Sequence, residues 1–147
     1  QRLHPRIIEV GLHPDGSLRD RHLWHLPPLA PRLLALRMDA ELDFASASAL
    51  ERRVAEHLAQ HPDVVHLCLL AQPINRIDVT GVETFAQLLA LMQSRGGTLH
   101  LSGLKLPAEQ VLRQAGLLEP RAGLAMYRTD ADMLVAMQQL PEPVAKA

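Results

Sequence analysis

The sequence predicts a single-domain α/β fold in which a mixed sheet of about 4–5 strands packs with about four helices. Short β-favouring runs alternate with longer segments whose apolar residues recur at helical spacing. One run, Val64–Leu70, is almost continuously apolar, which is typical of a strand buried on both faces of a parallel or mixed sheet. The length of 147 residues suits one compact domain with its own core.

The N-terminal part of the chain differs from the rest, because residues 1–31 hold five of the eleven prolines and four of the eight histidines. Within it, Arg6–Val10 is predicted as a strand and His13–Gly16 as a turn. Beyond the turn no sustained period is present. We therefore interpret 11–31 as a long Pro/His-rich surface connection in which Trp24 and Leu26 pack down.

The first strand–helix unit of the regular part follows that connection. Leu33–Met38 is a candidate strand, and an irregular link comes after it. Ser46 or Ser48 is placed to cap a helix whose buried face is formed by Ala47, Leu50, Val54 and Leu58. This helix is expected to end before Pro62, because the residue preceding a proline resists the helical conformation.

The remaining elements continue the alternation. They are a helix over Thr80–Ser94 ended by Gly96 and Gly97, a strand over Thr98–Ser102, a helix from Pro107 to Ala115 with Gly116 at its end, a short strand over Met126–Arg128, and a helix capped by Thr129 or Asp130 that runs to about Leu140. Met133 and Met137 are spaced as a core stripe on the last helix. We expect one domain over 1–147, with its core at 4–140 and a tail at 141–147.

Composition disfavours several classes of protein. A formal net charge of −1 and 3% aromatic residues argue against nucleic-acid binding. No apolar run approaches the ~20 residues that span a bilayer. The single cysteine, Cys68, lies in the middle of an apolar run, which predicts a buried, inert thiol in a reducing compartment. Because the chain starts at Gln1 without a methionine or a signal-peptide core, we expect it to be a piece of a longer protein.

Candidate catalytic and metal-binding residues are few. His57 and His61 lie four apart and so share a helical face, but no third metal ligand is evident nearby, and histidines also suit the negative end of a helix. We expect His13, His22 and His25 to be solvated or hydrogen-bonded. No nucleophile elbow, Walker loop, Rossmann glycine pattern or zinc spacing is present. The sequence thus predicts no enzymatic activity, no metal site and no cofactor.

The segment after the buried strand carries the clearest functional signal. Ligands and switches in open α/β sheets lie beyond the carboxyl ends of strands, where helices begin. Asp78, Thr80 and Gly81 occupy such a place, where a phosphate on Thr80 would meet the positive helix end and Arg76 could help to neutralise it. A structural alternative is open, because Thr80-x-x-Glu83 also fits a capping box.

Asn75-Arg-Ile-Asp-Val-Thr-Gly-Val-Glu83 resembles the signature of the STAS domain, the family named for sulfate transporters and anti-sigma factor antagonists. Three further segments are similar to the C-terminal cytoplasmic STAS domain of bacterial SulP-type anion transporters: His4–Gly11, Leu34–Ala47, and Leu99–Lys105 together with Val111–Leu117. The resemblance covers essentially residues 4–140. The chain departs from the family pattern at two positions: Asp43 stands where the family usually has an aromatic residue, and Ser46 stands where it often has Asn.

The resemblance implies a STAS-like fold and a non-catalytic regulatory and interaction domain of a SulP-family sulfate or anion transporter. Its expected place is the cytoplasmic face of the bacterial inner membrane, within an integral membrane protein. The implied partners are the transporter's own membrane domain and cytosolic regulatory proteins, without nucleic acid. Thr80 is the position equivalent to a phospho-acceptor, and the implied partner-contact residues are Asn75, Arg76, Asp78, Gly81 and Glu83.

Two alternatives belong to other classes of function. The first is a stand-alone phospho-switch of the anti-sigma factor antagonist type, with Thr80 as acceptor; such proteins usually are shorter and lack the long connection after the first strand. The second, ranked last, is a module that binds a nucleotide or another small molecule at the helix start near Thr80.

Overall fold

The structure is a computed structural model that describes residues 6–39 and 41–141 of the chain. It confirms a single α/β domain with a mixed sheet and four helices, but the sheet has six strands where about 4–5 were predicted. Apart from Pro141, the predicted tail lies outside the described residues. In the part described, no helix combines the length and apolar character needed to cross a bilayer.

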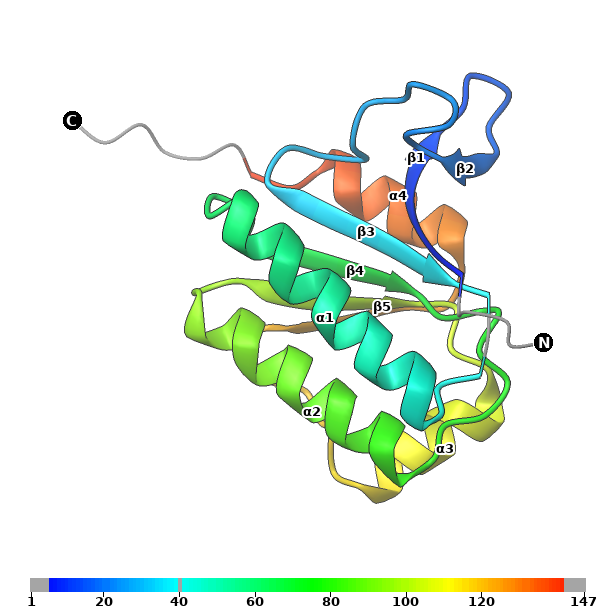
Figure 1. The fold of residues 1–147 in the computed structure, drawn as a ribbon, viewed down its shortest axis with the longest axis vertical. Coiled ribbons are helices and arrows are strands. Elements are labelled where there is room, and N and C mark those ends of the chain that lie inside the picture. The colour runs from blue at the N-terminus through cyan, green and yellow to red at the C-terminus, as the bar shows by residue number, and fades with distance from the viewer. Residues whose placement is uncertain (1–5, 40, 142–147) are drawn as a thin grey trace.

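The sheet has the strand order β2-β1-β3-β4-β5-β6, and Figure 1 shows its central strands side by side. Strand β1 pairs antiparallel with both β2 and β3, whereas β3, β4, β5 and β6 are parallel to one another. The strands are β1 (Ile7–Leu12), β2 (Leu18–Asp20), β3 (Leu33–Met38), β4 (His66–Leu70), β5 (Thr98–Ser102) and β6 (Leu124–Tyr127). Several predicted strand bounds shift by one or two residues, as at β4 and β6.

The helices cover both faces of the sheet. They are α1 (Phe44–Gln60), α2 (Val79–Ser94), α3 (Leu106–Gln114) and α4 (Asp130–Gln138), and Figure 1 shows α1 and α2 on the side opposite to α4. Side chains alternate across β3, so that Leu34 joins the larger core beneath α1–α3 while Ala35 joins a smaller core with Met133 and Met137 of α4. The predicted methionine stripe is thereby confirmed.

Helix α1 shows why its predicted face and end were right and its predicted cap was wrong. The four apolar residues of the predicted face are all buried, and the helix ends at Gln60, before Pro62. The N-cap is Asp43 and not Ser46 or Ser48, because the Asp43 carboxylate accepts a bond from the Ser46 backbone N at 3.1 Å. The Ser46 hydroxyl in turn accepts from the Asp43 backbone N at 2.9 Å, which completes a capping box.

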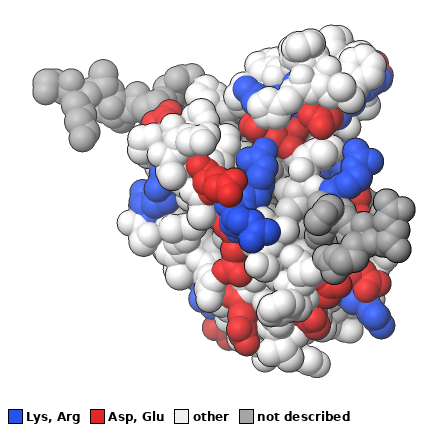
Figure 2. All heavy atoms as spheres, viewed as in Figure 1, with Lys and Arg blue, Asp and Glu red and all other residues white. Residues whose placement is uncertain are grey.

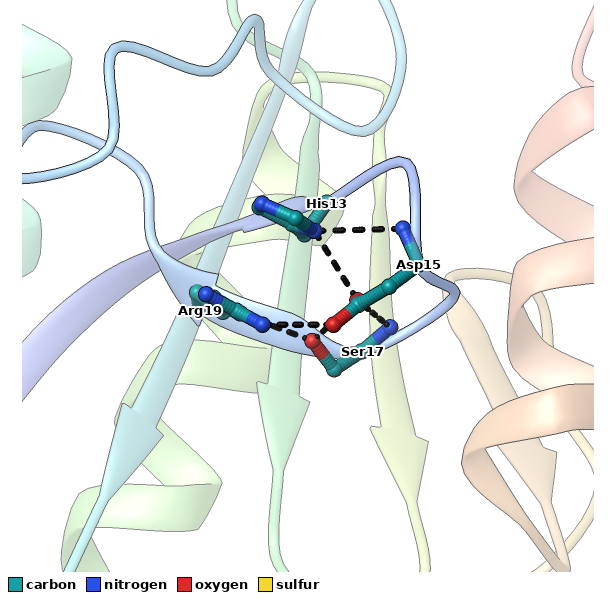
Figure 3. Close-up of polar contacts among 4 residues, drawn as sticks. All are labelled: His13, Asp15, Ser17 and Arg19. Atoms are coloured by element: carbon teal, nitrogen blue, oxygen red, sulfur yellow. Dashed lines mark hydrogen bonds and ion pairs between the residues drawn. The ribbon is translucent and has the colours of Figure 1, made fainter.

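The predicted connection 11–31 contains an additional strand, β2, which pairs with β1 as a hairpin. Figure 3 shows how the turn is held: the Asp15 carboxylate accepts from the Ser17 backbone N at 2.9 Å and from Arg19 Nη2 at 2.5 Å. The Ser17 bonds hold the pKa of Asp15 well below its ordinary value. The hairpin is therefore specified by side-chain chemistry in the turn and not by a period along the strand.

Trp24 and Leu26 differ in how they pack. Leu26 is half-buried and lies against Gly11, where a Cβ atom would come within 2.7 Å of the Leu26 Cβ. Trp24 was predicted to pack down, but 48% of it is exposed and it does not enter the core. Its ring instead meets His13 edge-on at a centroid distance of 5.3 Å and lies 4.3 Å from the Arg19 guanidinium carbon. The tryptophan thus stabilises the hairpin.

Candidate functional site

The candidate site lies at the edge of the sheet where the parallel strands β3, β4 and β5 end and where α1, α2 and α3 begin. Two loops meet there through the Leu42 backbone N, which donates to the Arg76 carbonyl at 3.2 Å, and through an isolated parallel bridge between Leu42 and Ile77. The third loop joins them because Lys105 Nζ donates to the Asn75 side-chain oxygen at 2.5 Å. We call this end of the molecule the helix-start face, defined by residues 41–44, 75–81 and 105–106.

Asp78 opens α2. Its carboxylate accepts a hydrogen bond from the Gly81 backbone N at 2.9 Å, and its backbone is extended, as an N-cap requires. Thr80 is the second residue of the helix, so the alternative capping box between Thr80 and Glu83 is not formed. Asp78 thus caps the Gly81 backbone N, whereas a cap at Thr80 would have accepted from the Glu83 backbone N.

Gly81 is required by a close approach between α2 and the segment before α1. A Cβ atom at this position would lie 2.7 Å from the Leu42 carbonyl oxygen and 2.8 Å from the Ile77 Cγ2 atom. Real Cβ atoms do not come so close to backbone oxygen, so only glycine lets the two loops pair here. Two residues of the Asp-x-Thr-Gly sequence therefore have a structural explanation.

Thr80 has no such structural explanation. Within the described residues its hydroxyl makes no hydrogen bond, and its side chain is half-buried at the surface of the helix start. The neighbouring Thr84 provides a contrast, because it is buried and its hydroxyl donates to the Glu51 carboxylate of α1 at 2.9 Å. Thr84 joins two helices, whereas the Thr80 hydroxyl is available to something outside the domain.

Large apolar side chains are exposed at the helix-start face, and sequence reasoning did not identify them as functional. Each of the three helices that begin here exposes a large apolar side chain at its first residue: Phe44 and Val79 are 74% exposed and Leu106 is 65% exposed. Singly exposed apolar residues are ordinary, but three at corresponding positions of adjoining helix starts form a surface that suits a protein partner. The sequence signal that could have identified them is an apolar residue directly after the helix cap that does not belong to the periodic, buried face of the helix.

The helix-start face holds three acidic residues, Glu41, Asp43 and Asp78, and two basic ones, Arg76 and Lys105. Glu83 lies one turn further along α2. The Arg76 guanidinium Nη2 lies 3.6 Å from the Glu41 carboxylate, and both side chains are exposed. Bonds from the Ser46 backbone and hydroxyl lower the pKa of Asp43, which keeps that group ionised.

A shallow hollow of about 300 Å³ separates the starts of α1 and α2, and it is lined by Glu41, Leu42, Asp43, Arg76, Ile77 and Asp78. Three carboxylates against one guanidinium make this hollow a poor place for a nucleotide phosphate. The geometry thus favours a protein contact at the helix-start face over a small anionic ligand.

The other residues considered from sequence lie apart from this face. His57 and His61 stack with ring centroids 4.3 Å apart at the end of α1, and across residues 6–39 and 41–141 no three potential ligands come together as a metal site. Cys68 is buried, and burial raises the pKa of its thiol to about 12. His13 belongs to the hairpin turn, and His22 contacts the buried Glu9 at 2.7 Å.

Comparison with known proteins places this fold in a family. The family model named STAS domain matches residues 28–131, more than two thirds of the chain. The chain therefore belongs to the STAS domain family, and the helix-start face contains the family's Asp-x-Thr-Gly sequence.

Relatives of this chain include sulfate transporters. High affinity sulfate transporter 2 of Stylosanthes hamata is 25% identical over 109 residues, which cover 67% of this chain and 16% of that protein. A Mycobacterium tuberculosis protein assigned as a sulfate transporter is 28% identical over 118 residues, covering 79% of this chain and 21% of that protein. The chain thus spans about a fifth or less of the length of these relatives.

Solved structures share the fold. The murine anion transporter Solute Carrier 26 family member A9 aligns with a TM-score of 0.72 at 14% identity, covering 92% of this chain and 22% of that one. A Thermotoga maritima protein assigned as an anti-sigma factor antagonist aligns with a TM-score of 0.65 at 18% identity, covering 80% of this chain and 98% of that one. At these identities the likeness concerns the fold alone.

Proposed function

We propose that this chain is a non-catalytic regulatory and interaction domain of a SulP-type sulfate or anion transporter. In this proposal residues 4–140 form the domain, which lies at the cytoplasmic face of a bacterial inner membrane as part of the longer transporter. The matches to sulfate transporters support the context, because the chain spans only 16–21% of their lengths. The transporter's membrane domain is then the first partner, and cytosolic regulators are further ones.

The exposed apolar side chains of the helix-start face carry the proposal. Phe44, Val79 and Leu106 belong to the same face as Thr80, are exposed, and do not contribute to the core of the domain. Burying such side chains against a partner contributes about 25 cal/mol per Å² of apolar area. Regulation then follows from whether the partner occupies this face.

The experiment compares two valines in the full-length protein that contains this chain. Val79→Asp places a charge in the apolar part of the helix-start face, whereas Val135→Asp changes a valine of α4 that is 55% exposed on the other side of the sheet. Uptake of labelled sulfate by cells expressing equal amounts of each variant is the readout. We expect Val79→Asp to change uptake at least about threefold, because one desolvated charge at an interface costs about 1 kcal/mol or more.

Equal uptake by Val79→Asp, Val135→Asp and the parent protein would remove the helix-start face from the mechanism. The coding sequence upstream of Gln1 tests the context separately. Hydrophobic spans there support a transporter, and a start codon close to Gln1 refutes it.

A second candidate function is the stand-alone phospho-switch, which the unbonded hydroxyl of Thr80 favours. A phosphate there would add nearly two negative charges next to Asp78 and near Asp43, so it would repel an acidic partner and disturb an apolar contact. Mass spectrometry of the native protein detects the modification. If Thr80 carries no phosphate and Thr80→Ala leaves both partner binding and transport unchanged, the switch is refuted.

A further inference from the structure

A second hollow lies at the opposite end of the sheet, between the end of α1 and the connection that leads into β3. Its volume is about 530 Å³, which is in the range of small-molecule sites. The hollow lies at the end of the sheet where the parallel strands start, because it is lined by Leu33, the first residue of β3, and by Val64, just before β4. It is therefore separate from the helix-start face, where the same strands finish.

Basic side chains from three segments line this hollow, which we call the basic groove. They are Arg21 and His22 after β2, Arg32 before β3, Arg53 and His57 of α1, and His61 at the end of α1. Figure 2 shows Asp and Glu side chains as well as Lys and Arg side chains below the upper lobe, which contains the β1–β2 hairpin of Figure 1. Residues far apart in the sequence thus contribute to one concave surface.

Much of the acidic charge in the basic groove is already engaged. Glu9, only 4% exposed, accepts from Arg21 Nη1 at 3.3 Å and contacts His22 Nε2 at 2.7 Å. The remaining carboxylate, Asp63, belongs to an exposed residue in the turn after α1. Two guanidinium groups, those of Arg32 and Arg53, are left to face the hollow.

Arg32 is held in place at a conformational cost. Its φ of +61° lies in the left-handed region, which is unusual for a residue other than glycine. Its Nε atom donates to the Asp63 carbonyl at 3.0 Å, and its own carbonyl accepts from the backbone N atoms of Val65 and His66. This bond holds the Arg32 side chain at Nε, and its two terminal nitrogens form no ion pair within the described part of the chain.

Arg53 belongs to α1 and lines the same groove as Arg32. It is half-buried, and among residues 6–39 and 41–141 it forms no ion pair. Burial lowers the pKa of the nearby His57, which favours the uncharged form of this imidazole, so the proposed site depends on the charges of its arginines. An uncharged imidazole still offers one N–H donor.

We propose that the basic groove binds a doubly charged oxyanion, either sulfate or the phosphate group of a phosphate monoester, between Arg32 and Arg53. Planar guanidinium groups donate paired hydrogen bonds to such anions. The C-terminal end of α1 opposes an anion with roughly half a negative charge, which the full charges of two guanidinium groups outweigh. This inference does not depend on the proposed function, because it concerns another end of the domain.

The test is a titration of the 147-residue chain with sodium sulfate at pH 7.5 and constant ionic strength, followed by amide NMR signals. Phenyl phosphate and sodium chloride replace sulfate in parallel titrations. We expect saturable shifts in the turn 61–64 and around Arg32 with one of the two dianions and not with chloride. The dianion that binds more tightly then shows whether the groove takes sulfate or a phosphate monoester.

Two arginines next to each other on α1 give a matched pair of variants. Arg53→Gln removes a guanidinium from the groove, and we expect it to weaken the binding of the preferred dianion about tenfold, as the loss of a charge-assisted hydrogen bond predicts. Arg52→Gln changes an exposed arginine that does not line the groove, and we expect less than a twofold effect. Arg53→Lys should recover part of the affinity, because it restores the charge without the planar fork.

The unfolding midpoint of each variant in urea shows whether it is folded. Equal affinities of folded Arg53→Gln and Arg52→Gln, or shifts that chloride reproduces, would overturn the site. Val79→Asp is expected to bind the anion normally, so a failed oxyanion site and a failed helix-start face give different results.

Discussion

The backbone N of Gly81 donates to the Asp78 carboxylate across 2.9 Å, and this bond makes Asp78 the residue that opens α2. Thr80, two positions later, is left without a structural bond in the described part of the chain. The Asp-x-Thr-Gly sequence thus separates into a cap, a point of close approach and a free hydroxyl.

Asp78→Ala and Thr80→Ala should therefore differ in stability. We expect Asp78→Ala to lower the free energy of unfolding by about 1 kcal/mol, because it removes an N-cap. Thr80→Ala should change it by less than about 0.5 kcal/mol, as for a surface residue without a partner. Urea unfolding followed by circular dichroism measures both. A larger loss for Thr80→Ala than for Asp78→Ala would show that the cap has been assigned to the wrong residue.

Gly81→Ala should destabilise the domain, although the same change inside a helix ordinarily stabilises it. The new Cβ atom would lie 2.7 Å from the Leu42 carbonyl, so α2 and the Leu42 segment must move apart. We expect a loss of about 1–3 kcal/mol, the usual cost of overpacking. Ala90→Gly, on the exposed face of the same helix, measures helix propensity alone and should cost about 1 kcal/mol. A stabilised Gly81→Ala would contradict the close approach.

The periodic elements could be predicted from the sequence because their information is local. The buried face of α1 follows from the spacing of Ala47, Leu50, Val54 and Leu58, and the cap of α4 follows from Thr129, whose hydroxyl accepts from the Asp132 backbone N at 3.1 Å. Gly116, with a φ of +75°, follows the C-cap of α3 and so ends this helix, as the sequence predicts. Each of these features depends on residues within a few positions of one another.

What the sequence did not predict depends on distant contacts or on a choice between equivalent residues. Asp78 and Thr80 are both residue types that cap helices well, and only the structure shows that Asp78 caps α2. Strand β2 has three residues and no period, so its existence rests on the turn around Asp15. Apolar residues such as Phe44 are assigned to the core by default, and only the packed structure shows that they point outward.

Acid should weaken the fold through a buried histidine, His100. His100, 2% exposed, has its Nε2 atom 3.1 Å from His66 Nδ1 and its Nδ1 atom 2.9 Å from the Tyr127 hydroxyl. Burial, with His66 as a smaller cause, lowers the pKa of His100 from 6.5 to about 4. The unfolded chain therefore binds this proton at higher pH than the folded chain, so stability is full above about 6.5 and falls as the pH drops towards 4.

The contribution of His100 is measured by comparing unfolding free energies at pH 7 and pH 4.5. We expect the parent chain to lose about 2–3 kcal/mol more than His100→Gln over this interval, because glutamine keeps hydrogen-bonding groups but does not titrate. His25→Gln changes an exposed histidine and should follow the parent chain. Parallel pH curves for the parent chain and for His100→Gln would show that His100 is not held neutral by burial.

Cys68 should resist alkylation for as long as the domain is folded. The thiol is buried between the sheet and α4, and burial raises its pKa to about 12, with Asp130 as a smaller contribution in the same direction. The thiolate, which is the reactive form, is therefore almost absent at pH 8, and the reagent also has no access to the sulfur. Iodoacetamide at pH 8 should leave the mass of the native chain unchanged over an hour and add one carbamidomethyl group in 8 M urea.

Because alkylation requires opening of the α4 side, Met133→Ala, which creates a cavity in the same small core, should make native Cys68 react faster. Rapid labelling of the native parent chain, or equal labelling rates in the two proteins, would place Cys68 outside that core.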